Sequence, residues 1–228
     1  MVIAEDYRFL VAEDAVNRIE NRIKGWSLPY PLNRGHALEC VKRVRSLLMK
    51  LKYMYLPHTM LINSDELRQL EVQVRELSSF LLPPRNIRID GVSMKITVAE
   101  LRYALSILLG LRARLALGDD NFPEYAVDIV GVEVGFLEKH PKADKLWIAR
   151  VGTEHFSFTV VTNISDIKKG EIRGIAILPP IIFFEVVSEA MFCSAPLDAS
   201  YKGKRVPVNL INRAEVSNVV ESIVKKLK

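Results

Sequence analysis

The chain has 228 residues, of which 49% are hydrophobic and 26% charged, a balance typical of globular proteins that excludes a disordered or fibrous chain. This length suits two domains better than one. The net charge of +5 is too small to indicate nucleic-acid binding by itself. Two cysteines are too few for a disulfide framework, so we expect a reducing compartment.

The sequence carries no pattern of secretion or membrane insertion. Charges at Glu5, Asp6 and Arg8 interrupt the start of the chain, so no secretory signal is recognised there. The longest apolar stretch, residues 175–187, contains two prolines and is shorter than the ~20 residues that span a bilayer. We therefore expect a cytoplasmic protein that does not enter a membrane.

The first half of the chain is patterned as helices. Apolar residues recur every three or four positions in four stretches, residues 12–26, 37–55, 67–81 and 101–115, which is the spacing of one helix face. Prolines follow the first three stretches. Ser64 and Asp65 mark the start of the third helix, and Thr97 to Glu100 fit a capping box at the start of the fourth.

A small β-hairpin is predicted over residues 87–96. Ile87 and Ile89 alternate with polar residues, and the same alternation resumes from Val92. Asp90-Gly91 stands between the two runs, and this dipeptide is a strong hairpin signal. We expect the hairpin to pack against the helices.

The second half is patterned as strands. Residues 118–124 are rich in Gly, Asp, Asn and Pro, and they form the predicted linker between a helical domain over 1–120 and a second domain over 121–228. β-branched and alternating apolar residues predict five strands near 127–134, 146–151, 156–160, 172–177 and 206–208. Five short strands in this length fit a small closed barrel. The spacing of Val216, Val220, Ile223 and Leu227 predicts a C-terminal helix, so the expected fold class is α+β.

Three segments of the second half form a pattern that carries chemistry. They are His140-Pro141-Lys142-Ala143-Asp144-Lys145-Leu146, Val160-Val161-Thr162-Asn163, and the run Pro179–Phe192 with Ser188-Glu189-Ala190-Met191 inside it. In this order and spacing they resemble the tRNA-binding OB-fold domain. That domain occurs in stand-alone tRNA-binding proteins and as an appendage of phenylalanyl-, methionyl- and tyrosyl-tRNA synthetases. The resemblance covers about residues 125–195 and implies a five-stranded OB-fold barrel that binds tRNA and commonly forms homodimers.

The sequence departs from the family pattern at two positions. Glu185 and Ala190 stand where the family usually has glycine. The glutamate adds negative charge where the resemblance places a phosphate. At the position of Ala190, alanine adopts a backbone conformation with positive φ less readily than glycine would. Both departures bear on RNA binding and leave the fold expectation intact.

The candidate RNA contacts of the barrel follow from what RNA offers. Phosphates need cations, and exposed bases need polar or flat side chains. The candidate cations are Lys142, Lys145 and Arg150, the candidate hydrogen-bonding groups are Asn163 and Ser188, and Met191 is a candidate packing surface for a base. In the alternative interpretation the lysines solvate a loop, His140-Pro141 shapes a turn, and Met191 belongs to the core.

A second candidate surface lies on the predicted helix over 37–55. Residues 34–52 hold six basic residues against the single acid Glu39. At 100° per residue, Lys42, Arg43 and Lys50 fall near the face opposite the apolar stripe. Arg45 and Lys52 lie along one side of the helix, and the five cations form a candidate phosphate-binding footprint. The alternative is an ordinary solvated helix face.

Signals for catalysis are weak. The sequence shows no Gly-rich phosphate loop and no nucleotide-activating signature. His36 and Cys40 have metal-ligand spacing on a helix, but two ligands do not make a site, so no metal or cofactor is predicted.

The leading hypothesis is a non-enzymatic protein of translation that binds tRNA by shape and backbone contacts. One version of this role is an accessory protein of an aminoacyl-tRNA synthetase. The alternative is an assembly or chaperone-like module whose barrel has lost RNA binding. An exposed apolar patch near Ile181, Ile182, Phe183 and Phe184 would support that alternative. An enzyme that uses the helical half is a third, weaker hypothesis.

Overall fold

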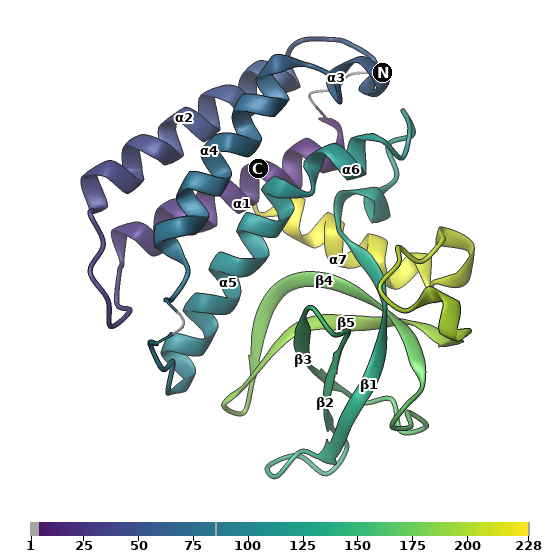
Figure 1. Ribbon diagram of the computed structural model, residues 1–228. Coiled ribbons are helices and arrows are strands. Elements are labelled where there is room, and N and C mark those ends of the chain that lie inside the picture. The colour runs from purple at the N-terminus through teal and green to yellow at the C-terminus, as the bar shows by residue number, and fades with distance from the viewer. Residues whose placement is uncertain (1–4, 85, 228) are drawn as a thin grey trace. The chain divides into compact units, whose positions relative to one another are not determined.

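A computed structural model describes residues 5–84 and 86–227, and the chain divides into two compact units (Figure 1). The first unit runs up to Val127 and takes in the residues from Val219 onward. The second unit is Asp128–Asn218. The first unit is helical and the second is built on a β-sheet, so the fold class is α+β.

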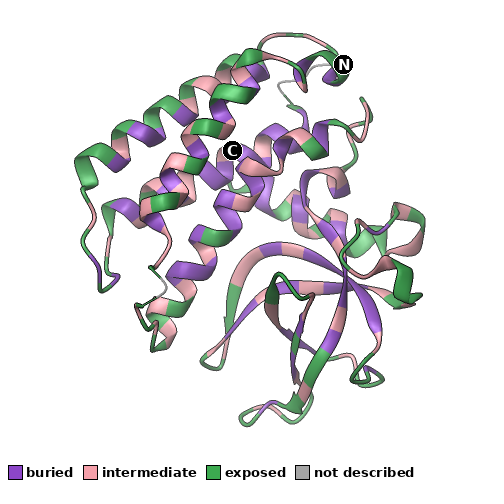
Figure 2. Ribbon diagram, in the orientation of Figure 1, coloured by how far each residue is buried: buried purple, intermediate pink, exposed green. Residues whose placement is uncertain are grey.

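The helices of the first unit are α1 (Tyr7–Lys24), α2 (Arg34–Lys52), α3 (His58–Leu61), α4 (Asp65–Leu81), α5 (Val92–Leu109) and α6 (Leu111–Leu115). The four predicted helices are confirmed, with α5 and α6 together covering the fourth. Each long helix turns a stripe of buried residues inward (Figure 2). Ser64 caps α4 as predicted, because its Oγ accepts the Leu67 backbone N–H at 3.3 Å.

The predicted hairpin over 87–96 is wrong, because residues from Val92 onward form the first turns of α5. Gly91 precedes the helix with φ 80° and ψ 151°, so the Asp-Gly dipeptide begins a helix instead of closing a turn. The capping box at Thr97 is also wrong: Thr97 lies inside α5, where its hydroxyl donates to the Ser93 carbonyl at 2.9 Å. α5 buries residues around much of its circumference, and this burial outweighs the local alternation of residues 92–96.

A buried ion pair fixes the start of α1. The Arg8 guanidinium donates to both carboxylate oxygens of Asp6, at 2.9 and 2.7 Å, and to the carbonyls of Gly118 and Asp120 at 2.7 and 3.0 Å. Burial alone would raise the pKa of Asp6. Hydrogen bonds from His58 and Arg8, with the Arg8 charge, outweigh that effect and lower the pKa to about 2.

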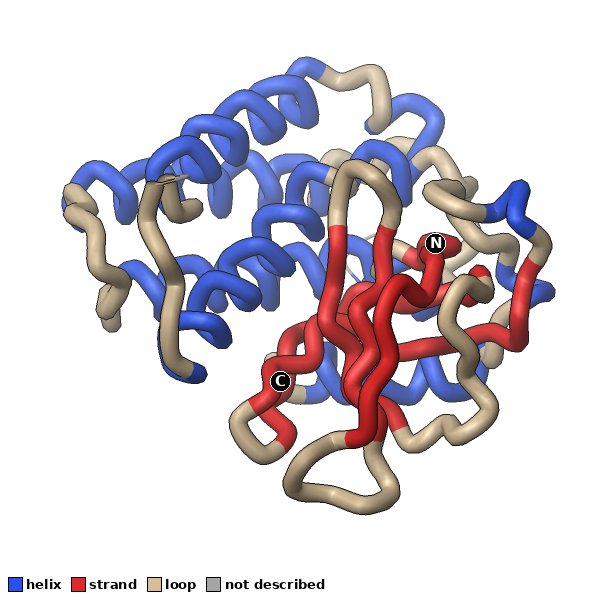
Figure 3. Tube along the Cα trace, turned by 60° about the horizontal axis from the view of Figure 1, so that its bottom comes forward, coloured by secondary structure: helices blue, strands red, loops and turns tan. Residues whose placement is uncertain are grey.

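The second unit is a five-stranded antiparallel sheet in the order β3-β2-β1-β4-β5. Its strands are β1 (Ile129–Lys139), β2 (Trp147–Gly152), β3 (Ser157–Thr162), β4 (Ile172–Phe183) and β5 (Val186–Leu197). The long strands bend along their length (Figure 3). Apolar side chains from all five strands form the core of the unit. Four predicted strands are confirmed. The predicted strand over 206–208 is wrong, since the fifth strand is β5.

The closed barrel is not confirmed. Among the described residues no ladder of backbone hydrogen bonds joins the edge strands β3 and β5. Side chains of β5 bridge the two edges instead: Ser188 Oγ accepts the Val161 N–H at 3.0 Å, and Glu189 accepts the Thr159 N–H at 3.0 Å.

The predicted C-terminal helix is confirmed as α7 (Arg213–Lys225). Val216, Val220 and Ile223 are buried, in keeping with the predicted stripe. The helix begins in the second unit, but its residues from Val219 onward belong to the first. None of the helices in the described part of the chain is both long and apolar enough to cross a membrane.

Candidate functional site

The three segments of the sequence pattern meet at one end of the sheet. His140 is buried and anchors the loop 140–146 to the hairpin that joins β4 and β5. The Lys142 backbone N–H donates to His140 Nδ1 at 3.1 Å, and His140 Nε2 lies 3.3 Å from the Phe183 carbonyl. Because Nδ1 accepts, the ring proton lies on Nε2 and is donated to that carbonyl. His140 therefore joins two segments that are over forty residues apart.

The tip of the β4–β5 hairpin is a two-residue turn in which both residues have positive φ. Phe184 has φ 44° and Glu185 has φ 78°. Such a turn favours Asn and Gly, and this explains the glycine that the resembled family usually has at the second position. Glu185 occupies it here, and its carboxylate lies 2.6 Å from Lys142 Nζ. The hydrogen bond and charge of Lys142 lower the pKa of Glu185.

Ala190, the second departure, is not in a turn. It lies in β5 opposite Ile177, is buried, and does not have a positive φ. An alanine fits this position without strain, so the expected conformational penalty at Ala190 does not arise.

Lys145 and Asn163 lie at the same end of the sheet as the anchored loop. Thr162, the last residue of β3, pairs with Trp147, the first residue of β2. Asn163 therefore follows β3 beside the point where the loop 140–146 enters β2. Both Lys145 and Asn163 are exposed. These two residues and Lys142 therefore lie at the same end of the sheet.

The other barrel candidates have different surroundings. Arg150 is exposed in β2, and its guanidinium carbon lies 5.7 Å from the centre of the Phe136 ring, its cross-strand partner. Ser188 is buried, and its hydroxyl accepts from Val161 N–H and donates to the Ala190 carbonyl at 3.2 Å. Met191 is half-buried in β5. Ser188 thus uses its hydroxyl within the protein.

The hairpin also exposes apolar side chains. Ile181 is 59% exposed, Ile182 46% and Phe184 58%. Phe184 packs against the His140 ring with centroids 5.6 Å apart, which fixes the tip to the loop below it. Large apolar side chains gathered in one exposed turn are typical of a surface that contacts another molecule.

Four of the five candidate cations of α2 are paired with acids, most of which other helices supply. Lys52, predicted to face outward, is buried and pairs with Glu13 of α1. Lys50 Nζ lies 2.7 Å from Glu66 of α4, and Arg45 lies 2.6 Å from Glu20 of α1. Lys42 pairs with Glu39 within α2 at 2.6 Å. Because Glu20 and Glu66 lie outside α2, the composition of that helix did not reveal them. The pairs lower the net positive charge of this face.

Sequence reasoning also missed two groups near the sheet end. Lys139 Nζ lies 5.7 Å from the centre of the Trp147 ring, and Phe136 is exposed beneath Arg150. Flat rings beside cations suit the stacking of unpaired bases. A β-bulge between Val134 and Phe136 in β1 changes which side chains share a face of the strand. The regular alternation of apolar residues in the sequence therefore does not reveal this arrangement.

These features define a protein with a helical unit and a separate antiparallel sheet whose loops meet at one end. The family model described as "Alpha helical domain" matches residues 3–118, just over half of the chain, so the protein belongs to that family. The match does not include residues 125–195, on which the resemblance to the tRNA-binding domain rests.

Two further comparisons are less informative. No curated protein matches the chain. Among solved structures, a MetRS-related protein from Pyrococcus horikoshii is similar at 24% identity, over 37% of this chain and 82% of that one, with a TM-score of 0.29. A likeness this weak carries no argument about function.

Proposed function

We propose that the protein is a non-catalytic tRNA-binding protein and that the sheet end around the loop 140–146 is its main RNA contact. The observation that carries the proposal is the meeting of the three pattern segments at that end. His140 joins the first segment to the third, and Ser188 joins the third to the second. The sheet unit is proposed to be an OB-fold barrel whose last edge is closed by Ser188 and Glu189 in place of a backbone ladder.

The proposed contacts divide into phosphate and base contacts. Lys142 and Lys145 supply cations for phosphates, with Arg150 further along β2. Asn163 supplies hydrogen bonds to a base or sugar, and Met191 lies on β5 as a packing group. Ser188 supports the site from within. This mixture recognises shape and backbone and does not require a particular base sequence.

The helical unit is proposed as a weaker, secondary contact. Lys42, Arg45 and Lys50 already pair with carboxylates, so a phosphate would have to displace a glutamate at each of them. Arg43 is exposed and hydrogen-bonded to Cys40 Sγ. A joint surface of α2 and the sheet loops, a homodimer, and an association with an aminoacyl-tRNA synthetase all stay predictions.

The test is the binding of bulk tRNA to the full chain, measured by fluorescence anisotropy across a salt series with a polyanion competitor. Lys142→Glu/Lys145→Glu should weaken binding by at least ~10-fold and reduce the salt slope by about 2, one for each phosphate that no longer meets a lysine. Lys168→Glu/Lys169→Glu is the matched control, because it reverses two exposed charges elsewhere in the same unit. Equal losses in both variants would mean non-specific attraction, and no binding at low salt would overturn the proposal.

A second function is favoured by the exposed apolar tip at Ile181, Ile182 and Phe184. The Lys142–Glu185 pair also neutralises one candidate cation. Both observations suit a module that binds polypeptide. In this case a labelled, permanently unfolded polypeptide should bind the protein. The parent protein should not bind tRNA, and Ile182→Ser/Phe184→Ser should abolish the binding of the polypeptide.

A further inference from the structure

The helices α2 and α4 bring three metal-binding side chains together. His36 and Cys40 lie one turn apart on α2, and Glu76 reaches them from α4. One donor atom of each residue, His36 Nε2, Cys40 Sγ and Glu76 Oε1, lies within 4.8 Å of the other two. The sequence showed the first two groups but not the third, which lies 36 residues further along the chain.

The donor atoms have the separations of a tetrahedral metal site. Nε2 to Oε1 is 3.3 Å, Sγ to Oε1 is 3.6 Å and Sγ to Nε2 is 3.8 Å. A tetrahedral Zn²⁺, with bonds of ~2.0 Å to nitrogen and oxygen and ~2.3 Å to sulfur, sets donor separations of about 3.3 Å without sulfur and about 3.5 Å with it. An ion can therefore enter with little movement of the three side chains.

Neighbouring groups hold the ligands in place. Gln73 Nε2 lies 3.3 Å from the second oxygen of the Glu76 carboxylate, which leaves Oε1 directed at Cys40 and His36. The Phe80 ring packs on the imidazole of His36 with centroids 5.5 Å apart. Such outer contacts orient ligands and strengthen metal sites.

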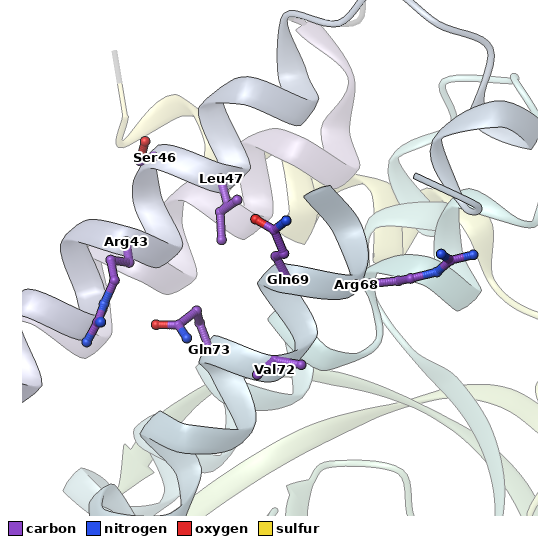
Figure 4. A pocket seen from close by; sticks show the side chains of 7 residues that line it. All are labelled: Arg43, Ser46, Leu47, Arg68, Gln69, Val72 and Gln73. Carbon is purple, nitrogen blue, oxygen red and sulfur yellow. The ribbon is translucent and has the colours of Figure 1, made fainter. Parts of the chain in front are cut away.

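The sulfur and the surface are both suited to a metal. Cys40 is buried between the helices, and the Arg43 guanidinium donates to its Sγ at 3.1 Å, which holds the sulfur at the open side of the helix pair. The side chains of His36 and Glu76 are 49% and 38% exposed, so an ion can reach them from solvent. Arg43, which contacts Cys40, and Gln73, which contacts Glu76, also line the groove between α2 and α4 (Figure 4).

We infer that His36, Cys40 and Glu76 form a binding site for a divalent transition ion of the Zn²⁺ class. A mixed nitrogen, sulfur and oxygen set selects such an ion over Mg²⁺ or Ca²⁺, which prefer oxygen ligands. Three protein ligands leave the fourth position to water or to a group from another molecule. The bound ion joins α2 to α4 and stabilises the helical unit.

The test uses the full chain, cleared of metal with a chelator and titrated with Co²⁺, whose visible spectrum reports geometry and sulfur ligation. We expect one Co²⁺ per chain, the absorption of a four-coordinate ion with a thiolate-to-cobalt band, and loss of both on addition of Zn²⁺. Cys40→Ser should lose the thiolate band, and Cys193→Ser, at the other buried cysteine, should keep it.

The side chains of His36 and Glu76 are partly exposed, so their substitution should disturb the packed core less than a change at Cys40. His36→Ala and Glu76→Gln should each weaken binding more than the ~10–100-fold expected of the outer-contact variant Gln73→Ala. The exposed His155→Ala should bind as the parent does. A parent chain that shows no four-coordinate cobalt spectrum at millimolar Co²⁺ overturns the inference. So does binding that survives unchanged in both His36→Ala and Glu76→Gln.

Discussion

At the scale of single residues, the sheet end is controlled by one unusual turn position. Glu185 combines a backbone conformation that glycine prefers with a carboxylate that pairs with Lys142. The first property costs stability, because a non-glycine side chain is strained at positive φ. The second holds a candidate phosphate ligand in an internal ion pair. Substitutions at Glu185 can separate the two effects.

Glu185→Gly should raise the melting temperature of the sheet unit by roughly 4 °C and strengthen tRNA binding, since it relieves strain and frees Lys142. Glu185→Gln keeps the backbone strain and removes only the charge. It should therefore strengthen tRNA binding without raising the melting temperature. Calorimetry and anisotropy on both variants decide the matter, and a Glu185→Gly protein with weakened tRNA binding would count against Lys142 as a phosphate contact.

Asp6 controls the acid stability of the helical unit. Its folded pKa of about 2 lies below the ordinary 3.8, so its stabilisation is present above pH ~4 and is lost as the pH falls toward 2. Asp6→Asn removes that titration. The stability advantage of the parent over this variant should shrink by roughly 2 kcal/mol between pH 5 and pH 2.

Urea unfolding at several pH values measures this difference. The exposed Asp144→Asn in the sheet unit is the control and should run parallel to the parent. A constant gap between the parent and Asp6→Asn across this pH range would show that the Arg8 and His58 bonds do not lower the pKa of Asp6 in solution.

At the scale of elements, helix starts depend on backbone geometry as much as on side-chain caps. α4 begins at a serine cap that the sequence reveals, whereas α5 begins after Gly91, whose φ of 80° and ψ of 151° are accessible almost only to glycine. The same Asp-Gly dipeptide predicts a hairpin from local pattern alone. The apolar stripe of α5 decides the outcome, since a helix buries more of it.

Gly91→Ala should destabilise the helical unit by about 1–3 kcal/mol, because alanine is strained at this backbone conformation. Gly35→Ala, in the first turn of α2, is the matched control. A methyl group there meets its nearest atom at 3.6 Å, and its φ is not positive, so it should be neutral or slightly stabilising. Chemical denaturation compares the two, and equal stabilities would contradict the backbone argument.

At the scale of the whole molecule, the last helix, α7, contributes residues to both compact units. α7 begins in the sheet unit, but its residues from Val219 onward belong to the helical unit, where Val220 and Ile223 are buried. A linker-based boundary near residue 120 assigns all of α7 to the second domain. The structure shows instead that a fragment ending before Val219 lacks part of the core of the first unit.

Ile223→Ala should destabilise the helical unit by about 2–5 kcal/mol, the usual effect of truncating a buried isoleucine. Hydrogen exchange locates the effect: amides of α1 and α5 should lose more protection than those of β1 and β4. The exposed Lys225→Ala in the same helix should change neither set. A loss of amide protection confined to β1 and β4 would show that the end of α7 stabilises the sheet unit instead of the helical unit.

The sequence by itself determined the elements whose pattern is local and long. The periodic stripes of α1, α2 and α4, the strands β1 to β4, the α+β class and the segments of the sheet end could be read from it, because burial imposes a regular spacing on such elements. It also singled out Lys142, Lys145 and Asn163 as candidate contacts, and the structure places all three at the same end of the sheet.

Only the tertiary structure decided the features that depend on distant partners. The start of α5 follows from burial against other helices, and β5 pairs with β4 where the sequence suggested residues 206–208. The cations of α2 meet acids of α1 and α4, Glu185 meets Lys142, and Glu76 completes the cluster of His36 and Cys40. Charge pairing and metal geometry act through space, so residues far apart along the chain show them only once it is folded.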